Sequence, residues 1–150
     1  MTSGHELVVV GVDGSVESVA ALAWAARYAT ASGARVRALL AWHYPNVAGA
    51  PPVERAPESV RGQTEHQMQA TLDEAVAKAC PGQTPAVETT IGYGHPAQVL
   101  IDASKDADLL VVGSHGRGKW SGMLVGSVSI HCVTGAHCPV VVVRRGESQR

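Results

Sequence analysis

The chain has 150 residues, a formal net charge of -1 and an apolar content of 45%, which predicts one globular domain with a full hydrophobic core. The near-neutral charge argues against a nucleic-acid-binding protein, which normally carries a basic excess. No apolar run reaches the ~20 residues of a membrane span, and the polar N-terminus lacks the order of a secretion signal. Three cysteines do not suggest a disulfide framework, so we expect a cytoplasmic protein.

Apolar segments and turn-forming residues alternate through the first third of the chain. Residues 7–12 form a β-branched run with the length of a buried strand. After a short turn, Ser15 is a good N-cap for a helix that runs to about Ser32. Residues 36–42 are predicted to form a second strand. Half of the chain's eight prolines follow it, which predicts a mobile loop over about residues 44–58.

The same alternation continues to the end of the chain. The remaining elements are predicted, in chain order, as a helix at 59–79, a strand at 87–91, a helix opened by Pro96, a strand at 109–112, a helix from Gly126 or Ser127 and a strand at 140–143. Strands that alternate with helices imply an α/β fold, with an open parallel sheet between two helical layers. We expect a single domain over residues 1–150, with its core at about 5–145.

Glycine spacing after the fourth predicted strand points to an anion site. Gly113 and Gly116 follow the apolar run directly, and nine residues separate Gly116 from Gly126 and Ser127. Glycines let backbone N–H groups approach phosphate oxygens closely, and the start of a helix adds partial positive charge. Ligands of open α/β sheets bind beyond the carboxyl ends of the strands, where the winding direction reverses. The pattern therefore predicts a nucleotide or phosphate site.

Three stretches of the sequence together resemble the universal stress protein family. They are the segment Val-Gly-Val-Asp-Gly-Ser at residues 10–15, the glycine pattern of residues 113–127 and the ending His-Cys-Pro followed by four valines at residues 137–143. The resemblance implies a Rossmann-like, adenine nucleotide alpha hydrolase-like fold with strand order 3-2-1-4-5. It further implies an ATP site between strands one and four, homodimers joined through the last strand, and a regulatory role in the stress response.

The resemblance also implies individual contacts to the nucleotide. Asp13 would lie at the ribose or at a phosphate-bound Mg²⁺ ion, and Ala41 would contact adenine. The other implied contacts are Gly11 and Val12 beside the nucleotide, and Gly113, Gly116, Gly126, Ser127, Val128 and Ser129 at the phosphates. Ser114, His115 and Gly118 belong to the same loop. Arg117 and Lys119 would add positive charge there.

These residues also have plainer interpretations. Asp13 could serve only in a turn, and Ser127 could be only an N-cap. The loop cations could be ordinary solvated charges. Residues 113–119 also match the first seven positions of the phosphate-loop pattern G-x-x-x-x-G-K-[ST]. The eighth position is Trp120, which has no hydroxyl for Mg²⁺, so this second motif is disfavoured.

The histidines and cysteines near the C-terminus raise the alternative of a metal site. His131, Cys132, His137 and Cys138 are close in sequence, but their spacing is not that of a zinc site. Cys132 is predicted to be a small core residue on an inward stripe that includes Val133. A structural zinc site is therefore disfavoured.

The sequence shows no activated nucleophile and no motif of a known hydrolase. We therefore expect an ATP-binding regulator and assign no catalytic residue. A slow ATPase or phosphotransferase, and an apo structural dimer that binds nothing, are the alternatives. The sequence does not distinguish ATP from AMP or another adenylate.

Overall fold

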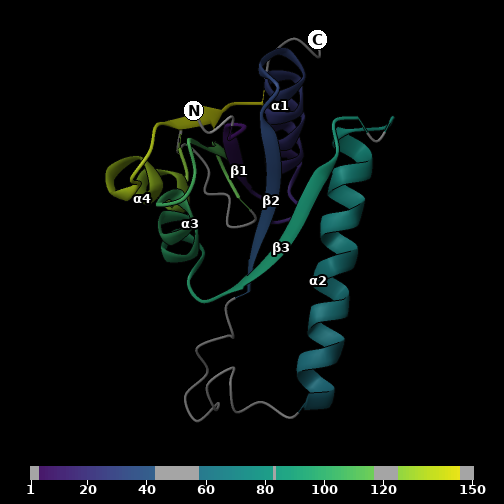
Figure 1. The fold of residues 1–150 in the computed structure, drawn as a ribbon. Helices are drawn as coiled ribbons and strands as arrows, with labels where there is room; N and C mark the ends of the chain where they lie inside the picture. The colour runs from purple at the N-terminus through teal and green to yellow at the C-terminus, as the bar shows by residue number, and fades with distance from the viewer. Residues whose placement is uncertain (1–3, 43–57, 83, 117–124, 146–150) are drawn as a thin grey trace.

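The structure, a computed structural model, describes residues 4–42, 58–82, 84–116 and 125–145, without the side chains of residues 59–61. The predicted mobile loop at 44–58 falls almost wholly outside these residues. The elements in chain order are β1 (Leu7–Gly11), α1 (Val16–Ser32), β2 (Arg35–Trp42), α2 (Glu58–Ala79), β3 (Val87–Tyr93), α3 (Pro96–Ser104), β4 (Leu109–Gly113), α4 (Ser127–Gly135) and β5 (Val140–Val143). Figure 1 shows these elements as a sheet with helices on either side.

The sheet is parallel and five-stranded, with the order β3-β2-β1-β4-β5. This is the predicted order. β1 lies at the centre, where Val8, Val9 and Val10 are fully buried because helices cover both of their faces. The chain first winds outward from β1 through β2 to β3 and then crosses back to β4. The direction of winding therefore reverses between β1 and β4.

Two apolar clusters hold the helical layers onto the sheet. One joins alternate residues of β1 and β2 to α1 and α2, with Leu22 and Leu72 fully buried at its centre. The other joins the intervening strand residues to α3 and α4, with Leu100 and Cys132 buried. The alternation follows from the two-residue period of a strand, which sends successive side chains to opposite faces.

Local signals fix the ends of the helices. Ser15 caps α1 and accepts a hydrogen bond from the Ser18 backbone N–H at 3.2 Å, as predicted. Gly33 ends the same helix in the left-handed conformation, with φ of 79°. Pro96 occupies the first turn of α3. One prediction about α4 is wrong: Val133 is 56% exposed and does not belong to the inward stripe of Cys132.

Two glycines in helical context predict stability changes of opposite sign. Gly33→Ala places a side chain in the left-handed region and should lower the free energy of unfolding by about 1 kcal/mol. Gly62→Ala falls inside α2 with open space around its Cβ position and should raise it by about 0.5–1 kcal/mol. Urea denaturation of both variants measures the two shifts. Equal shifts would contradict the assigned end of α1.

Candidate functional site

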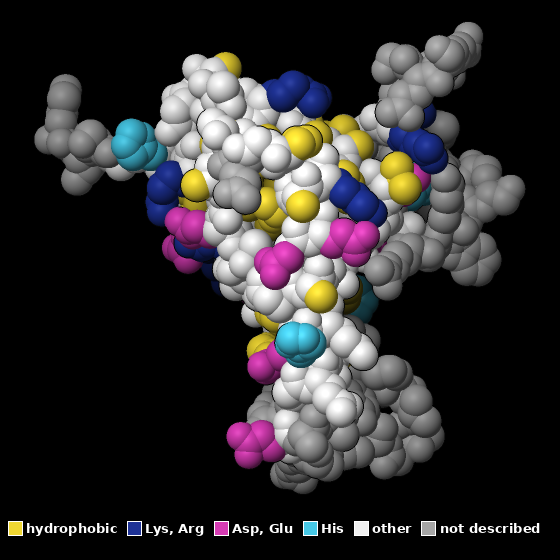
Figure 2. Space-filling model, turned by 90° about the vertical axis from the view of Figure 1, so that its right-hand side faces the viewer, with side chains coloured by type: hydrophobic (Ala, Val, Ile, Leu, Met, Phe, Trp, Pro, Cys, Tyr) yellow, Lys and Arg dark blue, Asp and Glu magenta, His cyan; other side chains and the backbone are white. Residues whose placement is uncertain are grey.

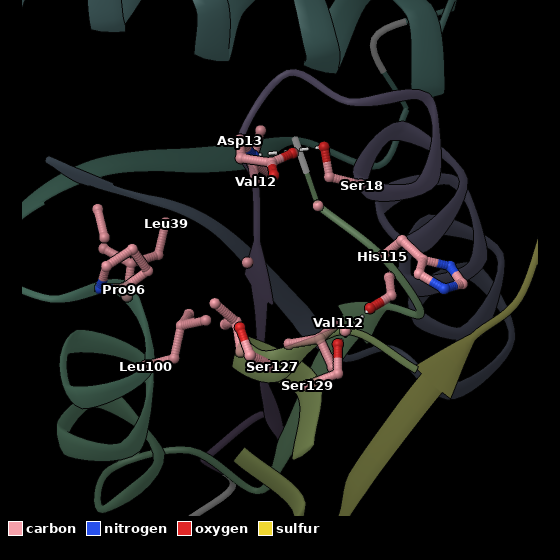
Figure 3. A pocket seen from close by; sticks show the side chains of 16 residues that line it. Val12, Asp13, Ser18, Leu39, Pro96, Leu100, Val112, His115, Ser127 and Ser129 are labelled. Atoms are coloured by element: carbon pink, nitrogen blue, oxygen red, sulfur yellow. Dashed lines mark hydrogen bonds between the residues drawn. The ribbon is translucent and has the colours of Figure 1, made fainter. Parts of the chain in front are cut away.

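A pocket of about 530 Å³ opens at the carboxyl ends of β1, β2 and β4, where the winding reverses (Figure 3). The starts of α3 and α4 border it. The sequence-predicted residues that line it are Gly11, Val12, Asp13, Ala41, Gly113, His115, Gly116, Gly126, Ser127, Val128 and Ser129. The tertiary structure thus brings the loops after β1 and β4 into one cavity. Arg117, Gly118 and Lys119 lie outside the described residues.

The loop after β1 forms a tightly bonded turn. The Ser15 backbone N–H donates to Oδ1 of Asp13 at 2.9 Å, and the Asp13 N–H donates to the Ser18 hydroxyl at 3.3 Å. The Ser18 hydroxyl in turn donates to the Ser15 carbonyl at 2.9 Å. Gly14 takes a φ of 83°, which this tight turn requires. The Asp13 side chain is therefore held in one orientation, and Ser18 is a pocket residue that the sequence analysis did not name.

Asp13 also lies against the glycine loop. A Cβ placed on Gly116 would lie 2.6 Å from Oδ2 of Asp13, which is inside van der Waals contact. The second carboxylate oxygen therefore approaches the loop backbone at a point where only glycine leaves room. The two segments that the sequence places about 100 residues apart meet at these two residues.

The end of β4 is bonded on several sides. The Ser114 N–H donates to the Val143 carbonyl at the end of β5, at 2.9 Å, and the Gly126 N–H donates to the Ser114 carbonyl at 2.5 Å. Ser114 is buried and does not line the pocket. Both backbone polar groups of Ser114 therefore have protein partners. Ser114 holds the loop after β4 in place from a buried position outside the pocket. Its hydroxyl lies 3.2 Å from Nδ1 of His115, which does line the pocket.

The start of α4 borders the opposite wall. Gly126 is the N-cap, with no side-chain capping bond, and Ser127 is the first residue of the helix. The plainer interpretation of Ser127 as an N-cap is therefore wrong. The first-turn N–H groups of a helix have no intrahelical partners. Together with the helix dipole, they give this wall a partial positive charge.

The rest of the pocket is apolar. Leu39 at the end of β2, Leu100 of α3 and Val112 of β4 line it, together with Pro96. Gly11 leaves the space that Leu100 fills, since a Cβ there would lie 2.9 Å from its Cδ1. Sequence reasoning missed these four because it counted them as core or helix-start residues. Strand alternation offered one signal, because Leu39 shares a face with Ala41, two residues further along.

The backbone of Ala41 also faces the pocket side of the sheet. The Val12 N–H donates to the Leu39 carbonyl at 2.9 Å, so the polar groups of Leu39 point toward β1. Alternate residues of a strand direct their backbone groups to the same neighbour. The N–H and C=O of Ala41 therefore also point toward the side of β1. They lie beyond Gly11, the last residue of β1, where that strand no longer runs alongside β2. They form a donor and an acceptor beside an apolar slot.

The metal alternative finds no support among the described residues. They contain no group of three or more His, Cys, Asp or Glu side chains that could hold a metal ion. Cys132 is fully buried, and this burial raises the pKa of its thiol to about 11. Its protonated form is a poor ligand at neutral pH. The structure therefore assigns Cys132 to the core, as the sequence predicted.

The family model of the universal stress protein family matches residues 5–144. The chain belongs to this family. Universal stress protein Rv2623 of Mycobacterium tuberculosis is 35% identical over 156 residues, covering 99% of this chain and 51% of that protein. The chain therefore spans about half the length of the curated relatives it matches.

Solved universal stress proteins have the same fold. A universal stress protein in complex with cAMP is 28% identical, with a TM-score of 0.68, covering 94% of this chain and 98% of the other. A family protein from Arabidopsis thaliana with AMP bound is 25% identical, with a TM-score of 0.62, covering 96% and 94%. Among the helices of the described residues, none has the length and apolar character needed to cross a membrane.

Two glycine substitutions distinguish a glycine packed against backbone from a glycine packed against a side chain of the pocket. Gly113→Ala brings a Cβ to 2.9 Å from the backbone of Glu17, which cannot move without moving α1, so we expect a loss of about 1–3 kcal/mol in unfolding free energy. Gly116→Ala meets the end of the Asp13 side chain, which can turn aside once it gives up its bond to the Ser15 N–H, so the loss should be near that of one hydrogen bond, about 1 kcal/mol. Thermal and urea unfolding measure both. A larger loss at Gly116 would contradict this assignment.

Proposed function

We propose that the chain binds ATP in the pocket between β1 and β4 and acts as a nucleotide-dependent regulator in the stress response. The observation that carries the proposal is the division of the pocket into two unlike halves. One half is an apolar slot at the ends of β2 and β4, and the other is built from glycine backbone and the start of α4, whose N-cap is Gly126. A nucleotide has the same division into a flat apolar base and anionic phosphates.

The apolar half suits adenine. Leu39 and Leu100 offer apolar walls to a flat ring, and the Ala41 backbone presents one donor and one acceptor beside them. The Watson–Crick edge of adenine carries an acceptor at N1 and a donor amino group. A paired donor and acceptor on the protein would therefore match it. This arrangement favours adenine over an apolar ligand of similar size.

Asp13 suits the ribose or a metal ion beside the phosphates. Its Oδ1 already accepts the Ser15 N–H, and both oxygens of a carboxylate retain further acceptor capacity. Ribose hydroxyls are donors that this carboxylate would accept. Mg²⁺ in nucleotide sites takes one or two carboxylates and fills its remaining positions with phosphate oxygens and water. A single aspartate thus fits Mg²⁺ held mainly by a triphosphate, where the ion would neutralise phosphate charge.

The phosphates would lie between Gly116 and the start of α4. Gly126, Ser127 and Val128 line the pocket there, and the first-turn N–H groups of the helix are suited to bind anions. We propose that Arg117 and Lys119 add cationic contacts from the same loop. The cAMP and AMP complexes of related proteins support an adenylate ligand. We propose ATP because the resemblance to the family implies an ATP site and this chain has every element of the glycine pattern.

Nucleotide release and calorimetry test the proposal. We expect denatured, freshly purified protein to release an adenine nucleotide, identified by chromatography, and calorimetry with Mg²⁺ to detect ATP binding. Gly126→Val should weaken ATP binding by about 10- to 100-fold, because a Cβ there already lies 3.3 Å from the Ser114 carbonyl and two further methyl groups would push the loop from the helix. The control Gly62→Val, with open space around it, should bind normally. The absence of heat with any adenylate would refute the proposal.

Turnover measurements separate a regulator from an enzyme. Hydrolysis would need a positioned base and water, and the Asp13 oxygen that accepts from Ser15 is already engaged. We expect the purified protein with Mg²⁺ to turn over ATP at no more than ~1 per minute, against ~1 to 1,000 per second for typical enzymes. Faster turnover would favour the ATPase or phosphotransferase alternative. All three cysteines are free thiols, and we propose a reducing, cytoplasmic location for the chain.

We further propose that the chain forms a homodimer through β5. The two sheet edges are unlike. Glu88 on β3 pairs with Arg37 at 3.1 Å, and the side of the molecule with α2 and β3 mixes acidic, basic and apolar side chains (Figure 2). β5 consists of four half-buried valines without a charge. An uncharged apolar edge normally pairs with another strand.

A proline substitution tests the dimer with the fold intact. Pro139 and Val143 accept hydrogen bonds from β4, so odd-numbered residues of β5 face β4 and Val142 faces the open edge. Val142→Pro should remove the free-edge N–H and give a monomer by sedimentation at micromolar concentration. Val142→Ala, which keeps the N–H, should remain a dimer. Wild-type protein that sediments only as a monomer would refute the dimer.

A further inference from the structure

We propose that Ser129 is a positioning residue, whose hydroxyl fixes the phosphate-binding half of the pocket by holding the carbonyl at the end of β4. The inference rests on the proposed function, because it assigns a role within the same nucleotide site. The role of Ser129 differs from that of Ser127 and Gly126. Those two residues would contact the phosphates directly, at the exposed start of α4.

Ser129 joins the two elements that enclose the phosphate half. It lies in the first turn of α4 and is 4% exposed. Its hydroxyl donates to the carbonyl of Gly113, the last residue of β4, at 2.5 Å. The bond spans 16 residues of sequence and closes the segment that holds the glycine pattern. A hydroxyl proton engaged in this way is not available to a phosphate oxygen.

Backbone bonds also hold the end of β4. Ser114 N–H donates to Val143, and Gly126 N–H donates to Ser114. Gly113 also packs against the backbone of Glu17, where a Cβ would lie only 2.9 Å away. These backbone bonds persist in any variant that does not introduce proline, whereas the Ser129 bond depends on one side-chain oxygen. Ser129 is therefore a point where a single substitution loosens α4 from β4 while leaving the glycines in place.

The expected consequence is confined to phosphate. Leu39 of β2 and Leu100 of α3, two walls of the apolar slot, lie on elements that the Ser129 bond does not join. The third wall, Val112 of β4, is held in the sheet by its pairing with β5. Without the hydroxyl, the Gly113 carbonyl loses its partner on α4, and the start of α4 is no longer tied to the glycine loop. The N–H groups would then meet a phosphate less well aligned, while the contacts to a base would be unchanged.

The test compares ligands with and without phosphate on matched variants. Ser129→Ala removes the hydroxyl and Ser129→Thr restores it. Thr134→Ala is the control, because the Thr134 hydroxyl donates to the Ile130 and His131 carbonyls on the outer face of the same helix. Calorimetry measures ATP and AMP affinity, and NMR titration measures adenosine. Hydrogen exchange of the Gly126 amide reports the clamp without any ligand, with the Val99 amide of α3 as an internal reference.

We expect Ser129→Ala to lose about five- to tenfold in affinity for ATP and AMP, with adenosine affinity within about twofold of wild type. Ser129→Thr should restore binding, Thr134→Ala should match wild type, and the Gly126 amide should exchange faster in Ser129→Ala alone. Parallel loss of adenosine, or unchanged ATP affinity, would overturn the positioning role. If wild-type protein binds no adenylate, the proposed function fails, and unchanged Gly126 exchange would separately overturn the clamp.

Discussion

The close approach of three glycines to neighbouring backbone and carboxylate atoms around the end of β4 is the constraint on which the rest of the site depends. Gly113 lies against the Glu17 backbone, Gly116 against the Asp13 carboxylate, and Gly126 against the Ser114 carbonyl. Each contact leaves too little room for a relaxed side chain. The loops after β1 and β4 can share one pocket because these three positions lack a Cβ, so polar backbone groups reach the cavity surface.

The pocket and the hydrophobic core share residues. Leu100 and Val112 belong to the apolar cluster under α3 and α4, and both also line the cavity. A ligand in the apolar slot would extend the packing of that cluster. A ligand that binds the folded state and not the unfolded state also stabilises the fold by mass action. If the pocket binds a nucleotide as proposed, its occupancy and the order around β4 would be linked, which would give a nucleotide-dependent regulator a physical basis.

The two edges of the sheet differ in charge. β3 carries a charged residue paired across the sheet, whereas β5 carries only valine. The last residue of β5 is also bonded to the loop after β4, through Val143 and Ser114. This hydrogen bond connects the edge proposed for pairing to Ser114, whose neighbours Gly113 and His115 line the pocket. The relatives that are about twice the length of this chain belong to the same family.

The sequence by itself determined the order and type of the elements, because their signals are local. The valine run of β1, the Ser15 cap and the alternation of strands with helices each act over a few residues. The strand order came from the family resemblance, and the structure confirmed it. The glycine spacing also predicted one wall of the pocket.

Tertiary structure alone decided the other contacts, because they join residues far apart in the chain. No local pattern could show that Leu39 and Leu100 form one slot, or that the Ser129 hydroxyl donates to the Gly113 carbonyl. Val133 shows the same limit, since helical spacing predicted it to be buried and it is exposed. Periodicity gives the direction of a side chain around its own helix, whereas burial depends on which neighbour covers that side.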